Sequence, residues 1–227
     1  MSCVTPETWI SAARFAPFLN AAAGDHELAV TLYDWHAELA AASFEAIHHF
    51  EVIVRNAIDG ALGEGQPQAP LKETWLLDFD LLQPGAIKRV IIAIERLGDK
   101  PATRGRVVAG VPFGFWASLF NRHHEELWRQ HMHRAFSHAA LERKELARSM
   151  SRILRFRNRV AHHDCLLLQN SEDLAAEMCR IVGWIDPRAC AWFAARTRVV
   201  DVLAEKRLTA SPQACSAAGA RAAMPSL

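Results

Sequence analysis

Residues 28–63, LAVTLYDWHAELAAASFEAIHHFEVIVRNAIDGALG, carry the pattern that decides the fold class. Apolar side chains recur along this stretch at helical spacing, at Leu32, Trp35, Leu39, Ile47, Phe50, Val54, Ile58 and Leu62. A polar stripe runs beside them, because His48, Glu51, Arg55 and Asp59 follow one another at intervals of three and four residues. The pattern predicts one long amphipathic helix that ends near Gly63.

The rest of the chain also has helical rather than strand periodicity, which predicts an all-α protein. Proline and capping residues mark the expected boundaries: a short helix from Thr5 that Pro17 ends, a helix between Pro84 and Gly98, one over 140–162, one from Asn170 or Ser171 through Ile185, and one from Asp186-Pro187 to near Lys206. Residues 1–208 are expected to form a single domain. The Ala/Ser/Pro-rich residues 209–227 are expected to be a disordered tail.

Composition limits the possible functions. The 227 residues are 51% hydrophobic and 22% charged, as in ordinary globular proteins, and the net charge is +1. Contact with nucleic acid must therefore come from a local cluster of basic residues. No apolar run approaches the ~18 residues of a membrane span, the first residues do not resemble a secretion signal, and five scattered cysteines indicate free thiols. We therefore expect a cytoplasmic protein with no membrane contact.

The predicted helix over 140–162 has two distinct faces. Apolar residues lie on one face, at Leu146, Met150, Ile153, Leu154 and Ala161, and Arg148, Arg152, Arg155 and Arg159 lie on the other. The exposed arginines Arg152, Arg155 and Arg159 are candidates for RNA binding. Arg157 breaks the pattern because its spacing places it in the apolar stripe, where a guanidinium needs a partner. Glu51 on the long helix is the candidate partner.

The same helix ends in RFRNRVAHH, residues 155–163, which contains Arg157 and Asn158 followed after three residues by His162. Together with FEVIVRNAID at 50–59, VPFGFWASLF at 111–120 and WIDPRACAWFAARTRVVDVL at 184–203, this motif resembles the Abi-like (abortive infection) group of the HEPN ribonuclease superfamily. The resemblance covers roughly residues 5 to 205, and four blocks in the family's order make it much more specific than the short motif alone.

The resemblance implies a HEPN-type helical bundle with additional N- and C-terminal helices. It implies a homodimer in which two Arg/His pairs form one metal-independent endoribonuclease site. A role in phage defence or as a toxin, restrained by an RNA or protein antitoxin, would follow from membership of this family. No cofactor is expected.

The chemistry of the motif has a physical basis of its own. Cleavage of RNA by its own 2′-hydroxyl needs a proton acceptor near neutral pH, which suits a histidine, and His162 is the candidate. The phosphorane-like transition state concentrates negative charge that a planar guanidinium can bind in a bidentate manner, and Arg157 is the candidate. His163 also fits the spacing, so the reactive imidazole stays open between the two histidines, with His162 favoured.

The supporting residues each have a structural alternative. Asn158 could orient the phosphate or the imidazole, or it could cap the helix end. Glu51, Arg55 and Asn56 could support Arg157, or Glu51 and Arg55 could form a plain surface pair four residues apart. A catalytically silent RNA-binding or protein-interaction module of the same fold is the alternative to the enzyme.

Two other kinds of site are less well supported. His123, His124, His131, His133 and His138 are numerous, yet they lack an HExxH or CxxC pattern, so a solvated polar helix is favoured over a metal site. Cys165 follows His162 closely, but no other residue in the sequence completes a thiol site.

Overall fold

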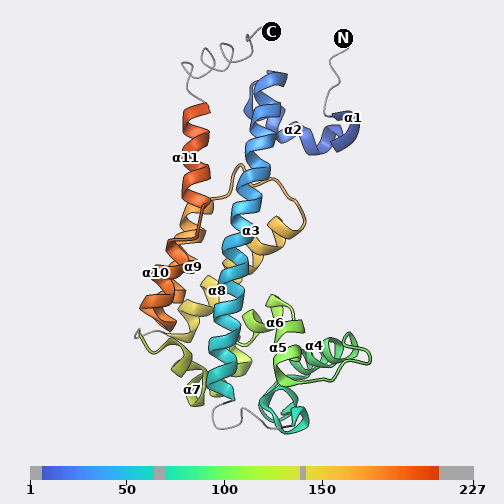
Figure 1. Ribbon diagram of the computed structural model, residues 1–227, viewed down its shortest axis with the longest axis vertical. Helices are drawn as coiled ribbons and strands as arrows, with labels where there is room; N and C mark the ends of the chain where they lie inside the picture. Colours follow the sequence, from blue (N-terminus) through green and yellow to red (C-terminus); the bar gives the residue numbers. More distant parts are fainter. Residues whose placement is uncertain (1–6, 64–69, 139–141, 210–227) are drawn as a thin grey trace, which may run out of the picture. The chain divides into compact units, whose positions relative to one another are not determined.

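A computed structural model describes residues 7–63, 70–138 and 142–209, with side chains described up to 205. Every regular element in these ranges is a helix, which confirms the all-α prediction (Figure 1). The α-helices are α1 Glu7–Ile10, α2 Ala12–Ala21, α3 His26–Leu62, α4 Pro84–Glu95, α5 Arg104–Gly110, α6 Phe113–Ser118, α7 Glu125–Gln130, α8 Arg143–Ala161, α9 Ser171–Ile185, α10 Pro187–Ala194 and α11 Val199–Thr209. Short 3-10 helices cover Leu71–Glu73, Trp75–Leu77, Arg122–His124 and Met132–Phe136. The predicted tail at 210–227 lies outside the described residues.

The chain divides into two compact units. The first contains residues 1–46, 159–175 and 197–227, and the second contains residues 47–158 and 176–196. The helices α3, α8 and α9 contribute residues to both units. None of the described helices is long and apolar enough to cross a lipid bilayer.

The first unit has a small core built on α2 and the start of α3. Phe15, Phe18, Ala22, Ala29 and Leu32 are buried there, and partly buried residues that include Tyr33, Cys165 and Leu167 pack against them. The expectation that Pro17 ends a helix is wrong, because α2 continues through it to Ala21. Phe15 and Phe18 flank the proline and are 0% and 2% exposed, so their burial offsets the one backbone hydrogen bond that proline removes.

Polar contacts cap α3 and join its first part to α11 in the first unit. Asp25 caps α3, since its Oδ1 accepts hydrogen bonds from the backbone N–H groups of Glu27 and Leu28 at 3.0 and 3.1 Å. Further along α3, the buried Trp35 donates its Nε1–H to the carbonyl of Val202 in α11 at 2.7 Å. Arg198 pairs with Glu45 at 2.9 Å. The contacts fix α11 against the first part of α3.

The second unit has a core rich in aromatic residues. Phe50 of α3 packs edge-on against Phe113 at 5.9 Å between ring centroids, and the rings of Phe115 and Trp116 contact Trp75 at 6.1 and 5.9 Å. All of these rings are at most 4% exposed. The VPFGFWASLF segment at 111–120 therefore supplies the centre of this core, which explains its break from simple helical periodicity.

A polar contact closes the end of α3 in the second unit. The carboxylate oxygen Oδ1 of Asp59 accepts hydrogen bonds from Trp75 Nε1 at 2.9 Å and from Arg104 Nε at 2.8 Å. The same guanidinium donates to the carbonyl of Asp59 at 2.6 Å. Asp59 therefore has a structural role, although the sequence places it on the same polar stripe as Glu51.

The histidine-rich segment does not form the solvated polar helix that the sequence favoured. A 3-10 turn, the short helix α7 and a second 3-10 turn follow one another instead. His124 is 4% exposed, its Nδ1 donates to the carbonyl of Ser118 at 3.2 Å, and its Nε2 accepts the N–H of Gln83 at 3.4 Å. The imidazole is thus held neutral, and burial lowers its pKa.

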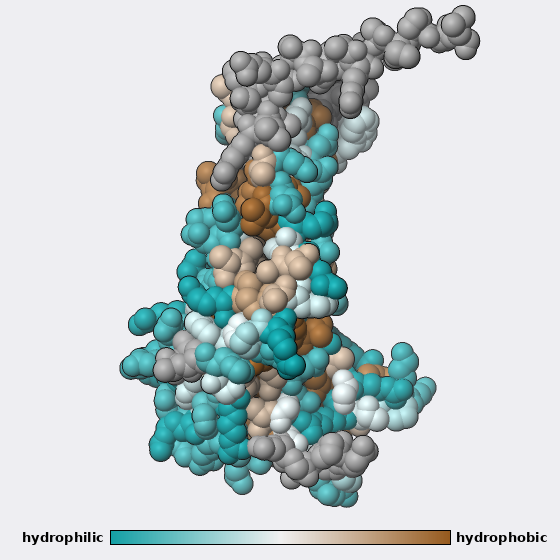
Figure 2. Space-filling view, turned by 60° about the vertical axis from the view of Figure 1, so that its left-hand side comes forward, coloured by the Kyte–Doolittle hydropathy of each residue, from teal (hydrophilic) through white to brown (hydrophobic). Residues whose placement is uncertain are grey.

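Hydrophilic residues dominate the face of the molecule drawn in Figure 2, where hydrophobic side chains form small, separate patches. The large apolar side chains that remain exposed in the described part of the chain are Trp9, Leu28, Phe44, Phe79, Ile91, Leu168, Trp192 and Val200.

Candidate functional site

The predicted two faces of α8 are present. Of the predicted apolar residues, Leu146, Met150 and Ile153 are completely buried and Leu154 and Ala161 are partly buried, while the four arginines of the other face are exposed. Arg157 lies on the apolar side as predicted, with a side chain that is 32% exposed. Apart from the buried Arg143 at its start, the helix therefore separates one partly buried arginine from four exposed ones.

Arg157 forms the ion pair with Glu51 that the sequence predicts. Its Nε donates to Glu51 Oε1 at 3.0 Å, and the side chains are 32% and 24% exposed. The terminal Nη1 and Nη2 groups of Arg157 form no hydrogen bond with another described residue. Since both residues belong to the second unit, their pairing is an internal feature of that unit.

A second guanidinium, that of Arg55, lies four residues after Glu51 on the polar stripe of α3. The Nε of Arg55 is buried and has no hydrogen-bond partner among the described residues. Burial raises the pKa of Glu51, and its hydrogen bond with Arg157 and the charges of Arg157, Arg55 and His48 oppose that rise. Two guanidiniums thus share one carboxylate that is costly to ionise. The excess positive charge in this partly buried place favours binding of an anion.

The end of α8 lies in the first unit and forms a Schellman cap. The N–H of Asp164 donates to the carbonyl of Arg159 at 2.9 Å, and the N–H of His163 donates to the carbonyl of Val160 at 3.1 Å. His163 has a φ of 57°, the left-handed conformation that this cap requires. His162 and His163 are both exposed, and only His163 has this unusual backbone.

Two contacts within the first unit hold the turn that follows His162. Arg14 Nη1 donates to the carbonyl of His163 at 3.1 Å. The N–H of Leu166 donates to Nε2 of His36 at 3.1 Å, and His36 is only 7% exposed. Burial lowers the pKa of His36, and a hydrogen bond with the backbone of Asp164 opposes that effect. A neutral His36 is therefore part of the support for the turn.

We expect the stability of the protein to fall as the pH drops below the ordinary histidine pKa of about 6.5, in part because of His36. The folded chain binds a proton at His36 at a lower pH than the unfolded chain does, so the stabilisation is complete above about pH 6.5 and is lost as the pH falls through the lowered pKa. Chemical denaturation of wild type and His36→Gln from about pH 8 to 5 measures this contribution. The difference between their unfolding free energies should change over that range, and parallel curves would contradict the prediction.

The remaining predicted residues have simpler surroundings. Asn158 and Asn56 are exposed. Asn158 lies inside α8 and does not cap it, because the left-handed capping position after the helix belongs to His163. Arg155 and Arg159 are exposed and form no ion pair with a described residue. Arg152 instead pairs with the buried Glu177 at 3.3 Å, so part of its charge is already neutralised.

Sequence reasoning missed a cluster of side chains on the second unit. His49 contacts Trp192 with 4.9 Å between ring centroids, and the guanidinium of Arg196 lies 4.3 Å from the centroid of the Trp192 ring. His49 lies next to the polar stripe of α3, and Trp192 lies in α10, whose start the sequence marks at Asp186-Pro187. No spacing rule connects residues so far apart in the chain.

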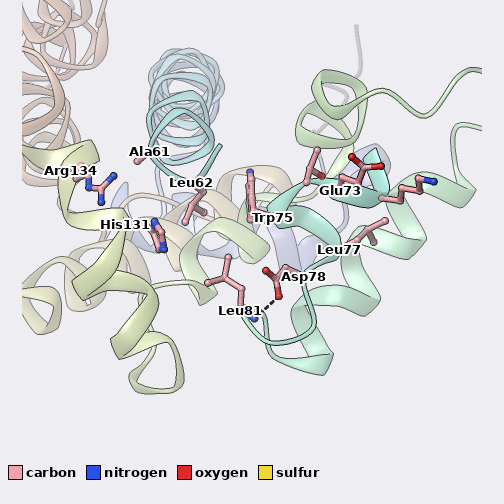
Figure 3. A pocket seen from close by; sticks show the side chains of 11 residues that line it. Ala61, Leu62, Glu73, Trp75, Leu77, Asp78, Leu81, His131 and Arg134 are labelled. Atoms are coloured by element: carbon pink, nitrogen blue, oxygen red, sulfur yellow. Dashed lines mark hydrogen bonds between the residues drawn. The ribbon is translucent and has the colours of Figure 1, made fainter. Parts of the chain in front are cut away.

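The described residues of the second unit also line an open cavity of about 640 Å³. Figure 3 shows Trp75 and Asp78 on one part of its wall and His131 and Arg134 on another. None of the residues predicted from the motif contributes to this wall. Among the described residues, no group of three or more His, Cys, Asp or Glu side chains is arranged to hold a metal ion.

Comparison of the chain with protein-family models, with curated proteins and with solved structures found no match. Membership of the Abi-like group therefore stays a prediction that rests on the four sequence blocks.

Proposed function

We propose that this protein is a metal-independent endoribonuclease of the HEPN type, in which Arg157 binds the scissile phosphate and His162 transfers the proton. The observation that carries the proposal is the state of Arg157. Its guanidinium is partly buried, is held at Nε by Glu51, and keeps two amino groups without a partner among the described residues. An arginine fixed in this way presents a planar pair of donors suited to phosphate oxygens.

The proposed reaction uses the RNA's own 2′-hydroxyl as the nucleophile. His162 accepts the 2′-hydroxyl proton as the 2′-oxygen bonds to phosphorus, and the bond from phosphorus to the 5′-oxygen breaks. The leaving 5′-oxygen takes a proton from the protonated imidazole or from water. The products are a 2′,3′-cyclic phosphate and a 5′-hydroxyl. Arg157 stabilises the charge that accumulates on the phosphoryl oxygens in the transition state.

The neighbours of Arg157 have defined roles in this proposal. Glu51 positions the guanidinium through its hydrogen bond to Nε, and Arg55 adds a second positive charge beside the phosphate. Asn158 and Asn56 are exposed amides that can donate to phosphate or sugar oxygens. Arg155 and Arg159 attract the RNA backbone through their positive charges. Arg152 contributes less, because Glu177 neutralises part of its charge.

The wider proposal follows the family resemblance. Two chains form a dimer with a composite site, each chain is a HEPN-type bundle, and the protein acts in the cytoplasm in phage defence or as a toxin. An RNA or protein antitoxin would restrain such an activity.

Incubation of the purified full-length chain with a mixed RNA pool and excess EDTA tests the reaction. We expect cleavage to continue, because side chains fill the acid–base and electrostatic roles. The fragments should carry 2′,3′-cyclic phosphate and 5′-hydroxyl ends, which end-specific enzymatic labelling identifies. Activity that appears only after a divalent cation is added would refute the metal-independent mechanism.

The catalytically silent alternative makes a different prediction for the same sample. RNA would be bound at low salt without any cleavage, and Arg157→Ala would then change affinity alone. To exclude a contaminating nuclease, Arg157→Ala and Arg159→Ala should be purified in parallel with the wild type. A contaminant would leave the same cleavage in all three preparations.

A further inference from the structure

The second unit carries a row of aromatic and basic side chains that the proposed reaction does not use. The rings of His48 and His49 on α3 lie 5.4 Å apart, and the His49 ring meets Trp192 edge-on at 4.9 Å. Arg196, two residues beyond α10, stacks its guanidinium over the same indole at 4.3 Å. All four residues belong to the second unit.

Trp192 is exposed although the next residue of α10 is a buried phenylalanine. Its neighbour Phe193 is completely buried in the core, whereas Trp192 is 42% exposed. Among residues 171–205, Trp192 and Val200 are the large apolar side chains that remain exposed, and Val200 belongs to the other unit. The exposed indole itself offers far less apolar surface than a stable protein interface buries. It has the size and chemistry of a nucleobase platform.

The indole is held in a defined position. Asp186 caps α10 by accepting the N–H of Arg188 at 2.7 Å, and Pro187 occupies the first helical position. Arg196 Nη1 donates to the carbonyl of Trp192 at 3.3 Å, which keeps the guanidinium over the ring. A platform that is ordered before binding loses little entropy when a ligand stacks on it.

The second unit also contains Arg157, the arginine proposed to bind phosphate, and its partner Glu51 lies near His48. His48 lies three residues before Glu51 on α3, and its charge acts on the Glu51 carboxylate that holds Arg157. Glu51, His48, His49 and Trp192 therefore follow one another as near neighbours. A strand of nucleic acid bound by its phosphate at Arg157 would meet basic and aromatic groups if it continued along these residues.

We propose that Trp192, together with Arg196 and His49, forms a base-stacking subsite for a nucleotide of single-stranded RNA adjacent to the phosphate at Arg157. This inference rests on the proposed function and adds a substrate feature to it, namely an unpaired base. A base in a duplex is already stacked and cannot use the platform, so the subsite selects single-stranded RNA. Because every base has a flat face, the subsite contributes affinity with little sequence preference.

Binding measurements with uncleavable oligonucleotides test the subsite without requiring catalysis. The probes are a fluorescent 2′-O-methyl oligo-adenylate and a chain of the same length and charge that lacks its bases. By anisotropy, the full-length wild type should bind the base-bearing probe about tenfold more tightly, on the scale of one stacked base. Trp192→Ala should abolish that difference, and Trp192→Phe should retain most of it.

Trp9→Ala is the matched control, since Trp9 is 74% exposed and belongs to the other unit. It should leave the ratio of the two affinities unchanged. An unchanged ratio in Trp192→Ala would overturn the subsite, and so would a change in oligomeric state of that variant in sedimentation, which would identify a subunit interface instead.

The test separates the two proposals. Cleavage of RNA that depends on Arg157, together with an unchanged affinity ratio in Trp192→Ala, would refute the subsite and leave the ribonuclease standing. A ratio that depends on Trp192, in a protein that does not cleave RNA, would support the subsite and refute the enzyme.

Discussion

With RNA at saturating concentration, Arg157→Ala is expected to lower kcat by roughly two to three orders of magnitude, the effect of removing one preorganised transition-state donor. The guanidinium is already held by Glu51 at 3.0 Å, so its donors need no reorganisation when charge develops on the phosphate. KM should change less than kcat, because the interaction strengthens in the transition state. Single-turnover cleavage of a fluorescent RNA measures the rate directly.

Arg159→Ala is the matched control for this experiment. Arg159 lies two residues further along the same segment, but its side chain is exposed and forms no ion pair with a described residue. Its loss should mainly raise KM and reduce the salt dependence of binding, with kcat close to wild type. Equal and severe losses of kcat in the two variants would show that the division of α8 into a catalytic and a solvated face is mistaken.

His162→Ala is expected to reduce kcat by about 10²- to 10⁴-fold, the usual contribution of a general base. The free energy of unfolding should change by less than about 0.5 kcal/mol, because His162 is exposed and contributes nothing to the core. His163→Asn should retain activity, since asparagine also tolerates the left-handed backbone at this position. Loss of activity in His163→Asn with full activity in His162→Ala would reverse the assignment.

The shared site of the proposed dimer can be tested with these same variants. In a mixed dimer of Arg157→Ala and His162→Ala chains, one intact arginine and one intact histidine come from different subunits. If the site is composite, mixing two inactive proteins should restore part of the activity. No recovery in dimers that form normally would argue for a site within one chain.

Periodicity predicted the long helices well because their burial is regular. The apolar positions of α3 and α8 face a core at every turn, and Arg157 stood out because its charge interrupted such a face. The need of a buried guanidinium for a carboxylate then pointed to Glu51, and the two residues do pair.

The features that sequence reasoning missed depend on tertiary contacts. Pro17 stays inside α2 because two buried phenylalanines hold that helix, and His124 is buried because a backbone donor and acceptor satisfy its ring. The edge-on contact of His49 with Trp192 joins two residues that lie far apart in the sequence. Local propensity contains no information on any of these three arrangements.

The left-handed backbone of His163 limits which amino acids natural variants of this protein can carry there. Glycine and asparagine fit the Schellman turn, whereas valine, isoleucine and threonine would strain it and move the carbonyl of residue 163 away from Arg14. Among close homologues, position 163 should therefore alternate among histidine, asparagine and glycine, while position 162 should keep its histidine. Backbone conformation would thus limit the amino acids at position 163, whereas constancy at position 162 would follow from the proposed chemistry.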